Sequence, residues 1–127
     1  MNIIYEGFFV INELDSRLEK DIENKHITTE YRPKKSHEHL YGERATFAIT
    51  GYGCDGQNEG YSVTLLSCDN EELVNLFNQI TVPHITLSVS REGRPKDTCN
   101  LTFEDYRSNT IIKTVFGGFN GQPVLRR

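Results

Sequence analysis

The sequence has few cysteines, no long apolar run and no excess of positive charge, and each absence excludes a class of protein. The three cysteines, Cys54, Cys68 and Cys99, are far apart and outside any Cys-x-x-Cys spacing. An odd, scattered set predicts neither a disulfide framework nor a zinc site, so we interpret these residues as reduced thiols. No apolar run approaches the roughly 20 residues that a membrane-spanning helix needs.

Residues Met1–Val10 also lack the charged start and the cleavage site of a signal peptide. We therefore predict a cytoplasmic protein that does not enter a membrane. The formal net charge of −4 argues against binding of long nucleic acid through bulk electrostatics, but it allows a small phosphorylated ligand or an RNA end. A length of 127 residues predicts a single domain, 1–127, with a core of its own.

The tripeptide His-Ile-Thr is present twice, at His26–Thr28 and at His84–Thr86. In a β-strand, residues two apart share a face, so the histidine and the threonine of each copy are expected to lie side by side. The same rule places Glu30 on the first of these faces and Ser88 on the second. An imidazole beside a hydroxyl, displayed twice, suits a phosphate held between two groups that exchange protons.

The first copy follows a predicted strand and a predicted helix. Residues 2–10 are rich in Ile, Tyr, Phe and Val, which predicts the strand. Asn12 can cap a helix that begins directly afterwards. Three apolar residues of this helix would share one face at spacings i, i+4 and i+8, and they are Leu14, Leu18 and Ile22.

The second copy follows the same order of elements. A strand is predicted at 61–67, and Asp69 can cap the helix that follows. Pro83 ends that helix immediately before His84. The two units, approximately 2–31 and 60–90, predict a two-lobed domain with approximate two-fold symmetry and one histidine on each wall of a cleft. The apolar face of the second helix contains Leu73, Leu76, Phe77 and Ile80.

The rest of the chain predicts further strands at 44–50, 100–103, 110–116 and 123–125, with turns at Gly117-Gly118 and Asn120-Gly121. The glycine-rich segment 51–60 is either a plain hairpin connection or a phosphate cradle, although it matches no known phosphate-binding fingerprint. Basic residues after each tripeptide either draw a phosphorylated substrate toward the cleft or are solvated charges at strand ends. These residues are Arg32, Lys34 and Lys35, and Arg91, Arg94 and Lys96.

Two His-x-Thr strands, each after a strand and a helix, resemble the two-histidine (2H) phosphoesterase superfamily of RNA 2′,3′-cyclic phosphodiesterases and 2′-5′ RNA ligase-like proteins. The likeness spans roughly residues 3–89, and the run from Pro83 to Leu87 is a typical second motif. It implies a bilobal α+β fold, with two antiparallel sheets lining a central cleft and helices outside. It also implies cleavage or formation of phosphodiester bonds without metal or cofactor, on a 2′,3′-cyclic phosphate or a 2′-5′ linked RNA or nucleotide.

By motif, the resemblance makes His26 and His84 the catalytic acid/base pair and makes Thr28 and Thr86 substrate-binding donors to phosphate oxygens. The chemistry of the residues agrees with these roles. Hydrolysis of a cyclic phosphate needs a base to deprotonate water and an acid to protonate the leaving ribose oxygen, on opposite sides of phosphorus. Two imidazoles can fill both roles without a metal. The sequence does not say which histidine is the base.

Three other interpretations of the sequence stay open. His37 and His39, with Glu38 between them, would share a strand face and could hold a metal, although no third ligand follows nearby. The same cleft could instead bind a nucleotide or an RNA end without turnover. The chain could also be a structural or interaction domain whose histidines lie on half-exposed strands.

Overall fold

The computed structural model describes residues 2–126, and its strands form one antiparallel sheet. The strands are β1 (Tyr5–Val10), β2 (Lys20–Asp21), β3 (His26–Tyr31), β4 (Arg44–Cys54), β5 (Asn58–Cys68), β6 (His84–Val89), β7 (Glu104–Asp105), β8 (Ile111–Phe119) and β9 (Pro123–Val124). The helical elements are the α-helix α1 (Glu71–Asn78) and the 3₁₀ helices η1 (Glu38–Leu40) and η2 (Pro95–Asn100). The main path of the sheet runs β2-β6-β5-β4-β8-β1-β3, while β7 pairs with β4 and β9 pairs with β8.

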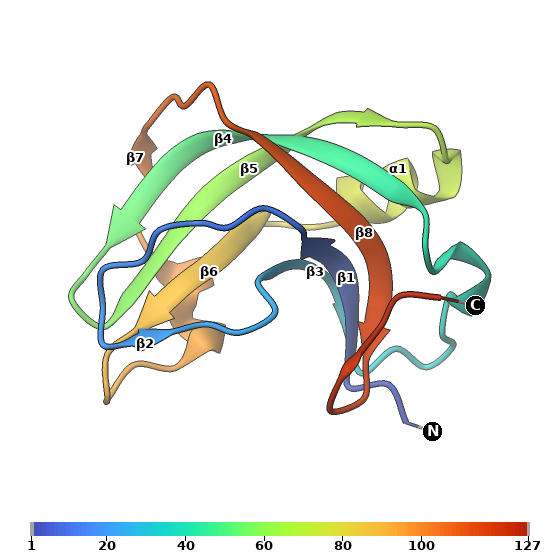
Figure 1. Ribbon diagram of the computed structural model, residues 1–127, viewed down its shortest axis with the longest axis horizontal. Coiled ribbons are helices and arrows are strands. Elements are labelled where there is room, and N and C mark those ends of the chain that lie inside the picture. Colours follow the sequence, from blue (N-terminus) through green and yellow to red (C-terminus); the bar gives the residue numbers. More distant parts are fainter. Residues whose placement is uncertain (1, 127) are drawn as a thin grey trace.

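The predicted bilobal α+β fold with two antiparallel sheets and outer helices is wrong. A single sheet of nine strands takes its place, and α1 is the one α-helix within residues 2–126. The sheet is strongly curled (Figure 1), so that β3 and β6 approach each other with Cα atoms within 8 Å. Four strands separate these two in the sheet order. The histidine strands are therefore brought together by the bending of one sheet.

Aromatic rings fill the core on one face of this sheet. Phe8 lies edge to face against both Phe47 and Phe116, with ring centroids 5.0 and 5.4 Å apart. Ile27 and Ile85, the central residues of the two tripeptides, are fully buried in the same core. Because side chains alternate along a strand, burial of these isoleucines turns the flanking histidines and threonines to the opposite face.

The helix predicted after Asn12 does not form, and that prediction is wrong. Asn12 bonds to β8 instead, since its Oδ1 accepts from the Lys113 N–H at 2.6 Å and its Nδ2 donates to the Ile111 carbonyl at 3.2 Å. The N–H groups of residues 17 and 18 donate to side chains of β5 and β6 at 2.9 and 3.1 Å. These tertiary hydrogen bonds outweigh the helical spacing of the leucines. The segment runs across to pair with β6 as β2 and then returns to begin β3 (Figure 1).

The second predicted helix is present as α1, with its cap one residue later than expected. Asn70, and not Asp69, is the N-cap, and its Oδ1 accepts from the Leu73 N–H at 3.2 Å. The buried Phe77 packs against Phe47, with ring centroids 5.5 Å apart. Within the described chain, no helix has the length and apolar character that crossing a membrane requires.

The C-terminal part of the chain differs from the prediction at two places. Residues 100–103 form no strand, because η2 extends to Asn100 and the next strand is β7. Gly117-Gly118 lies inside β8 and forms no turn. A Cβ on Gly117 would lie 2.4 Å from the Val124 carbonyl oxygen, so glycine is required where β9 crosses closely. The strands predicted at 44–50, 110–116 and 123–125 are present as β4, β8 and β9, although β8 begins at Ile111 and β9 ends at Val124.

Candidate functional site

A cavity of about 300 Å³ is lined by β1, β3, β6 and η2 on the face of the sheet opposite the core. All four residues predicted from the tripeptides line it: His26, Thr28, His84 and Thr86. Five further residues complete the lining, and they are Tyr5, Ile22, Tyr31, Pro95 and Lys96. The curl of the sheet thus brings both histidine–threonine pairs to one cavity.

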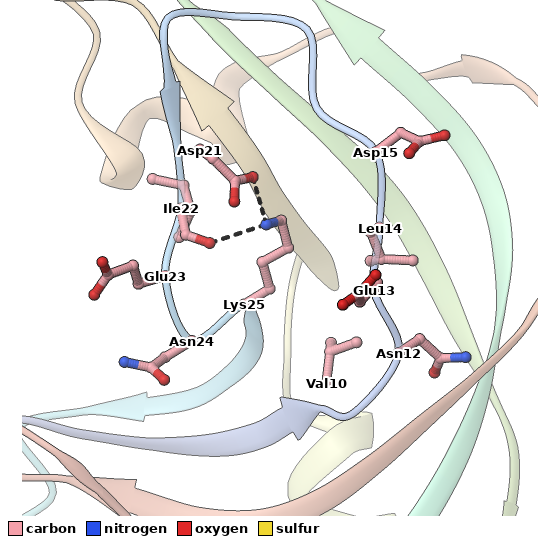
Figure 2. Close-up of a pocket in the computed structure, with 10 residues that line it drawn as sticks. All are labelled: Val10, Asn12, Glu13, Leu14, Asp15, Asp21, Ile22, Glu23, Asn24 and Lys25. Carbon is pink, nitrogen blue, oxygen red and sulfur yellow. Dashed lines mark hydrogen bonds and ion pairs between the residues drawn. The ribbon is translucent and has the colours of Figure 1, made fainter.

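A second, larger cavity of about 600 Å³ lies between residues 10–15 and residues 21–25 (Figure 2). Its acidic lining residues outnumber its one cation, Lys25. A lining of this sign repels an anionic ligand. The acidic residues are Glu13, Asp15, Asp21 and Glu23.

The two imidazoles are oriented in the same way by the backbone. His26 Nδ1 lies 3.0 Å from the Asn24 carbonyl oxygen, and His84 Nδ1 lies 2.7 Å from the Val82 carbonyl oxygen. A carbonyl oxygen only accepts, so each Nδ1 carries a hydrogen and donates it. Each Nε2 is then the atom that gains or loses a proton, which is the arrangement an acid/base pair needs.

The turn before β3 holds the carbonyl that orients His26. Asn24 has a φ of 56°, in the left-handed region that asparagine tolerates better than most residues. Figure 2 shows the Lys25 side chain folded back across this turn, where its Nζ donates to Asp21 Oδ1 at 2.7 Å and to the Ile22 carbonyl at 2.9 Å. These bonds fix the turn on which the tautomer of His26 depends.

Aromatic rings cover His26. Tyr5 stacks on it with ring centroids 4.2 Å apart and planes 18° apart, and Phe9 lies 5.6 Å away. Burial lowers the pKa of His26 to about 4; the hydrogen bond to Asn24 opposes this shift, and the charge of the nearby His84 adds to it. His26 is therefore neutral at neutral pH, and the two histidines are close enough to interact electrostatically.

A β-bulge in β3 changes the face that its outer residues occupy. Thr28 pairs with Gly7, whereas Glu30 pairs with Glu6, so the register shifts by one residue between them. Opposite residues of an antiparallel pair share a face, and Glu30 therefore lies on the face away from Thr28. The prediction that Glu30 shares the histidine face is wrong. Tyr31 is turned to that face in its place and lines the cavity.

A matching bulge changes the face of Ser88 in β6. Thr86 pairs with Gly60 and Ser88 pairs with Glu59, again with a register shift between them. Ser88 is fully buried and donates to Glu59 Oε1 at 2.7 Å. The predicted place of Ser88 beside His84 and Thr86 is therefore also wrong. Each bulge lies directly after the threonine of its tripeptide.

The same Glu-Gly dipeptide lies opposite both bulges, as Glu6-Gly7 and as Glu59-Gly60. A Cβ on Gly7 would lie 2.2 Å from the Ile27 carbonyl oxygen, and one on Gly60 would lie 2.7 Å from the Ile85 carbonyl oxygen. Each glycine therefore lets its strand approach the centre of the facing tripeptide. We did not predict these residues from the sequence. Their signal is present there as Glu-Gly followed by an aromatic residue, at 6–8 and at 59–61, ahead of each tripeptide.

Both glutamates are buried hydrogen-bond acceptors. Glu6 accepts from Tyr41 Oη at 2.7 Å and from the N–H and Nδ1 of His37, each at 2.7 Å. Glu59 accepts from Tyr52 Oη and, at 2.9 Å, from the Arg17 N–H. Burial and the neighbouring carboxylate raise the pKa of each tyrosine, which keeps the phenols neutral donors. Each glutamate holds a connecting segment against the sheet.

His37 and His39, the alternative metal ligands left open by the sequence, do not share a strand face, because η1 begins at Glu38. His39 Nε2 lies 3.0 Å from Glu72, while His37 bonds to Glu6. Among residues 2–126, the one group of three side chains close enough to share a metal is Glu6, Glu30 and His37, whose ligand atoms lie within 4.8 Å of one another. Within this group, the hydrogen bonds of His37 to Glu6 hold the start of η1 against β1.

The two threonines of the cavity differ in their hydrogen bonds. Thr86 Oγ1 donates to Thr98 Oγ1 at 2.9 Å and lies 3.4 Å from the Pro95 carbonyl oxygen. The buried Thr98 also accepts from Asn58 Nδ2 at 3.0 Å. Within residues 2–126, no hydrogen bond to the Thr28 hydroxyl is found. Thr28 is therefore free to bind a ligand, whereas Thr86 is held by η2.

The glycine-rich segment is a hairpin connection between β4 and β5. Asp55 Oδ1 accepts from the N–H groups of Gln57 and Asn58 at 2.9 and 2.8 Å. A carboxylate thus occupies the amides that a phosphate would need, and the interpretation as a phosphate cradle is not supported. Of the six basic residues that follow the tripeptides, Lys96 lines the cavity.

Comparison of the sequence with models of known protein families finds no match, and comparison with curated proteins finds none either.

Proposed function

We propose that this protein is a metal-independent phosphodiesterase of the 2H type, acting on a 2′,3′-cyclic phosphate or on a 2′-5′ linked RNA or nucleotide. The observation that carries the proposal is the convergence of His26, Thr28, His84 and Thr86 on one cavity of about 300 Å³. Convergence is informative because the two tripeptides lie on strands that are not neighbours in the sheet. The partner is a nucleotide or an RNA terminus that carries a phosphodiester.

In this mechanism His26 is the base and His84 is the acid for hydrolysis. His26 Nε2 takes a proton from water as the water oxygen attacks phosphorus. His84 in its protonated form donates the Nε2 proton to the ribose oxygen as the bond from that oxygen to phosphorus breaks. The assignment is supported by the surroundings of His26, where stacked aromatic rings favour the uncharged imidazole.

Three groups can stabilise charge on the non-bridging phosphate oxygens. The Thr28 hydroxyl is free to donate, and the Thr86 hydroxyl can turn from Thr98 to the ligand at the cost of one hydrogen bond. The Lys96 ammonium adds a positive charge to the cavity wall. Each histidine is expected to contribute about 10²- to 10⁴-fold to the rate.

The test is an assay of the protein with nucleoside 2′,3′-cyclic phosphates and 2′-5′ linked dinucleotides in excess chelator, with products identified by phosphorus NMR. We expect hydrolysis in chelator and loss of activity in His26→Ala and in His84→Ala. Activity that chelator abolishes would contradict the metal-free mechanism. Activity retained in both variants would remove these histidines from the site.

The alternative function on the same cavity is binding of a nucleotide or an RNA end without turnover. Nucleoside 2′-monophosphate that binds the wild-type protein and competes with an unreacted cyclic phosphate would establish it.

The three cysteines are free, as expected for the reducing cytoplasm in which we propose that the protein acts.

A further inference from the structure

We propose that Tyr31 is the platform on which the substrate's base stacks, so that the cavity selects nucleoside phosphodiesters over phosphodiesters without a base. This inference rests on the proposed function, because it assigns the substrate class of the same cavity. It concerns a residue outside the two tripeptides and outside the acid/base chemistry.

Tyr31 is a large aromatic residue at the cavity rim that is left open to solvent. It lines the cavity, yet 65% of its surface is exposed. Its ring is stacked with that of Tyr5, with centroids 6.2 Å apart and planes 18° apart, and Tyr5 is stacked in turn on His26 at 4.2 Å. The centre of the Tyr31 ring is therefore within about 10 Å of the centre of the His26 ring. A nucleotide can span this distance with its phosphate at one end and its base at the other.

The bulge in β3 is the reason that Tyr31 is at this place. Without the register shift after Thr28, regular alternation would put Glu30 on the cavity face and Tyr31 on the opposite face. The bulge therefore removes a negative charge from the site of an anionic ligand and supplies an aromatic ring in the same step. An exposed tyrosine that served only the strand would not need this change of face.

The remaining walls of the cavity suit a base beside a phosphate. Ile22 and Pro95 are apolar groups in the same lining as Lys96 and the two histidines. A phosphate alone gains nothing from apolar walls, whereas a base gains from both apolar contact and stacking. Burial raises the pKa of Tyr5 to about 12, so the ring beneath Tyr31 stays an uncharged phenol. Stacking tolerates any base, so we expect little preference among the four bases.

The experiment compares Tyr31→Leu and Tyr31→Phe with the wild type on two substrates. One substrate is uridine 2′,3′-cyclic phosphate, and the other is 1-O-methylribose 2,3-cyclic phosphate, which has no base. We expect Tyr31→Leu to lower kcat/KM on the uridine substrate by roughly 10- to 100-fold and to leave the base-free substrate unchanged. Tyr31→Phe keeps a stacking face, and we expect it to retain wild-type selectivity.

Tyr106→Leu is the matched control. Tyr106 is also an exposed tyrosine, at 44%, and stacks on Tyr61 outside the cavity. We expect Tyr106→Leu to leave kcat/KM unchanged on both substrates. Equal losses on both substrates in Tyr31→Leu would make Tyr31 a structural residue and overturn the inference, and so would the absence of any loss.

A binding measurement separates failure of this inference from failure of the proposed function. If the wild type hydrolyses neither substrate and no 2′-5′ linked dinucleotide, the proposed function fails. Calorimetric titration with uridine 2′-monophosphate and with 1-O-methylribose 2-phosphate then tests Tyr31 directly. Tighter binding of the uridine compound, lost in Tyr31→Leu, supports the platform, whereas equal binding of both compounds by the wild type overturns it.

Discussion

In both the β1–β3 pair and the β5–β6 pair a Glu-Gly dipeptide faces a His-Ile-Thr tripeptide in the same register, yet the two pairs surround their histidines with different groups. Around His26 the neighbours are the rings of Tyr5 and Phe9. Around the second pair, a chain of hydrogen bonds from Asn58 through Thr98 reaches the threonine beside His84. One backbone arrangement can therefore present two chemically different imidazoles, one kept neutral by burial and one beside a polar network.

Substitution of either histidine should have the largest effect on kcat/KM. Two substrates with different leaving groups should then distinguish the base from the acid. We expect His26→Ala and His84→Ala each to lower kcat/KM on a cyclic phosphate by about 10²- to 10⁴-fold. A nucleoside p-nitrophenyl phosphodiester has a leaving group that needs no proton. On that substrate His84→Ala should recover most of its activity while His26→Ala should not. Recovery in His26→Ala alone would reverse the assignment of base and acid.

The pH dependence of folding should distinguish the buried histidine. Burial lowers the pKa of His26 from 6.5 to about 4. Between these two pH values the imidazole is protonated in the unfolded chain but stays neutral in the folded protein. The stability is fully present above pH 6.5 and is lost as the pH falls toward 4, by up to about 3 kcal/mol. Urea unfolding at pH 7 and pH 4.5 should show a smaller loss in His26→Asn than in the wild type. Equal losses in the two proteins would contradict the burial of this group.

Substitution of the two matched glycines should test how closely the strands approach. We expect Gly7→Ala and Gly60→Ala to lower the free energy of unfolding by roughly 1–3 kcal/mol, with the larger loss at Gly7. The backbone oxygen that a Cβ would meet lies at 2.2 Å for Gly7 and at 2.7 Å for Gly60, so the clash is more severe at Gly7. Gly56→Ala measures a different cost, because no atom lies within 4 Å of a Cβ there and any loss comes from its φ of +86° alone. Urea unfolding of Gly7→Ala and Gly60→Ala with wild-type free energies would contradict the close approach.

Removal of the two threonine hydroxyls should have the smallest effects, and these effects should differ in unfolding free energy. Thr28→Val is expected to lower kcat/KM without changing stability, because no partner within the described residues depends on its hydroxyl. Thr86→Val should lower both, with a loss of about 1 kcal/mol in unfolding free energy, since its hydroxyl bonds to the buried Thr98. Thermal unfolding and steady-state kinetics on the same samples measure both quantities. A stability loss in Thr28→Val alone would contradict this difference.

Local features of the site were predictable from the sequence, while its long-range arrangement was not. Strand alternation around Ile27 and Ile85 correctly separated the buried isoleucines from the histidines and threonines that line the cavity. The bulges were missed, because a register shift depends on the facing strand and its glycine, and strand periodicity is read from one strand at a time. The misplacement of Glu30 and the omission of Tyr31 follow directly from this.

The number of sheets also could not be predicted from local patterns in the sequence. The helical spacing of Leu14, Leu18 and Ile22 is real, but the hydrogen bonds that override it come from residues more than 40 positions away in the sequence. A repeated helix was the basis for two lobes, and without the first helix the two strand pairs join one continuous sheet. The matched Glu-Gly dipeptides were the better signal of the repeat, because they specify pairing geometry directly.

The short strand β2 has a consequence for how this protein behaves in a crowded solution. An outer strand with unpaired N–H and C=O groups invites other chains to add to the sheet. β2 covers the outer edge of β6 with two exposed residues of opposite charge, Lys20 and Asp21, opposite Val89 and Ser88. The sheet therefore ends on this side in a short charged strand that protects the Ser88–Val89 end of β6 from pairing with another chain. The segment that gives this protection is also the one that leads into the strand of His26.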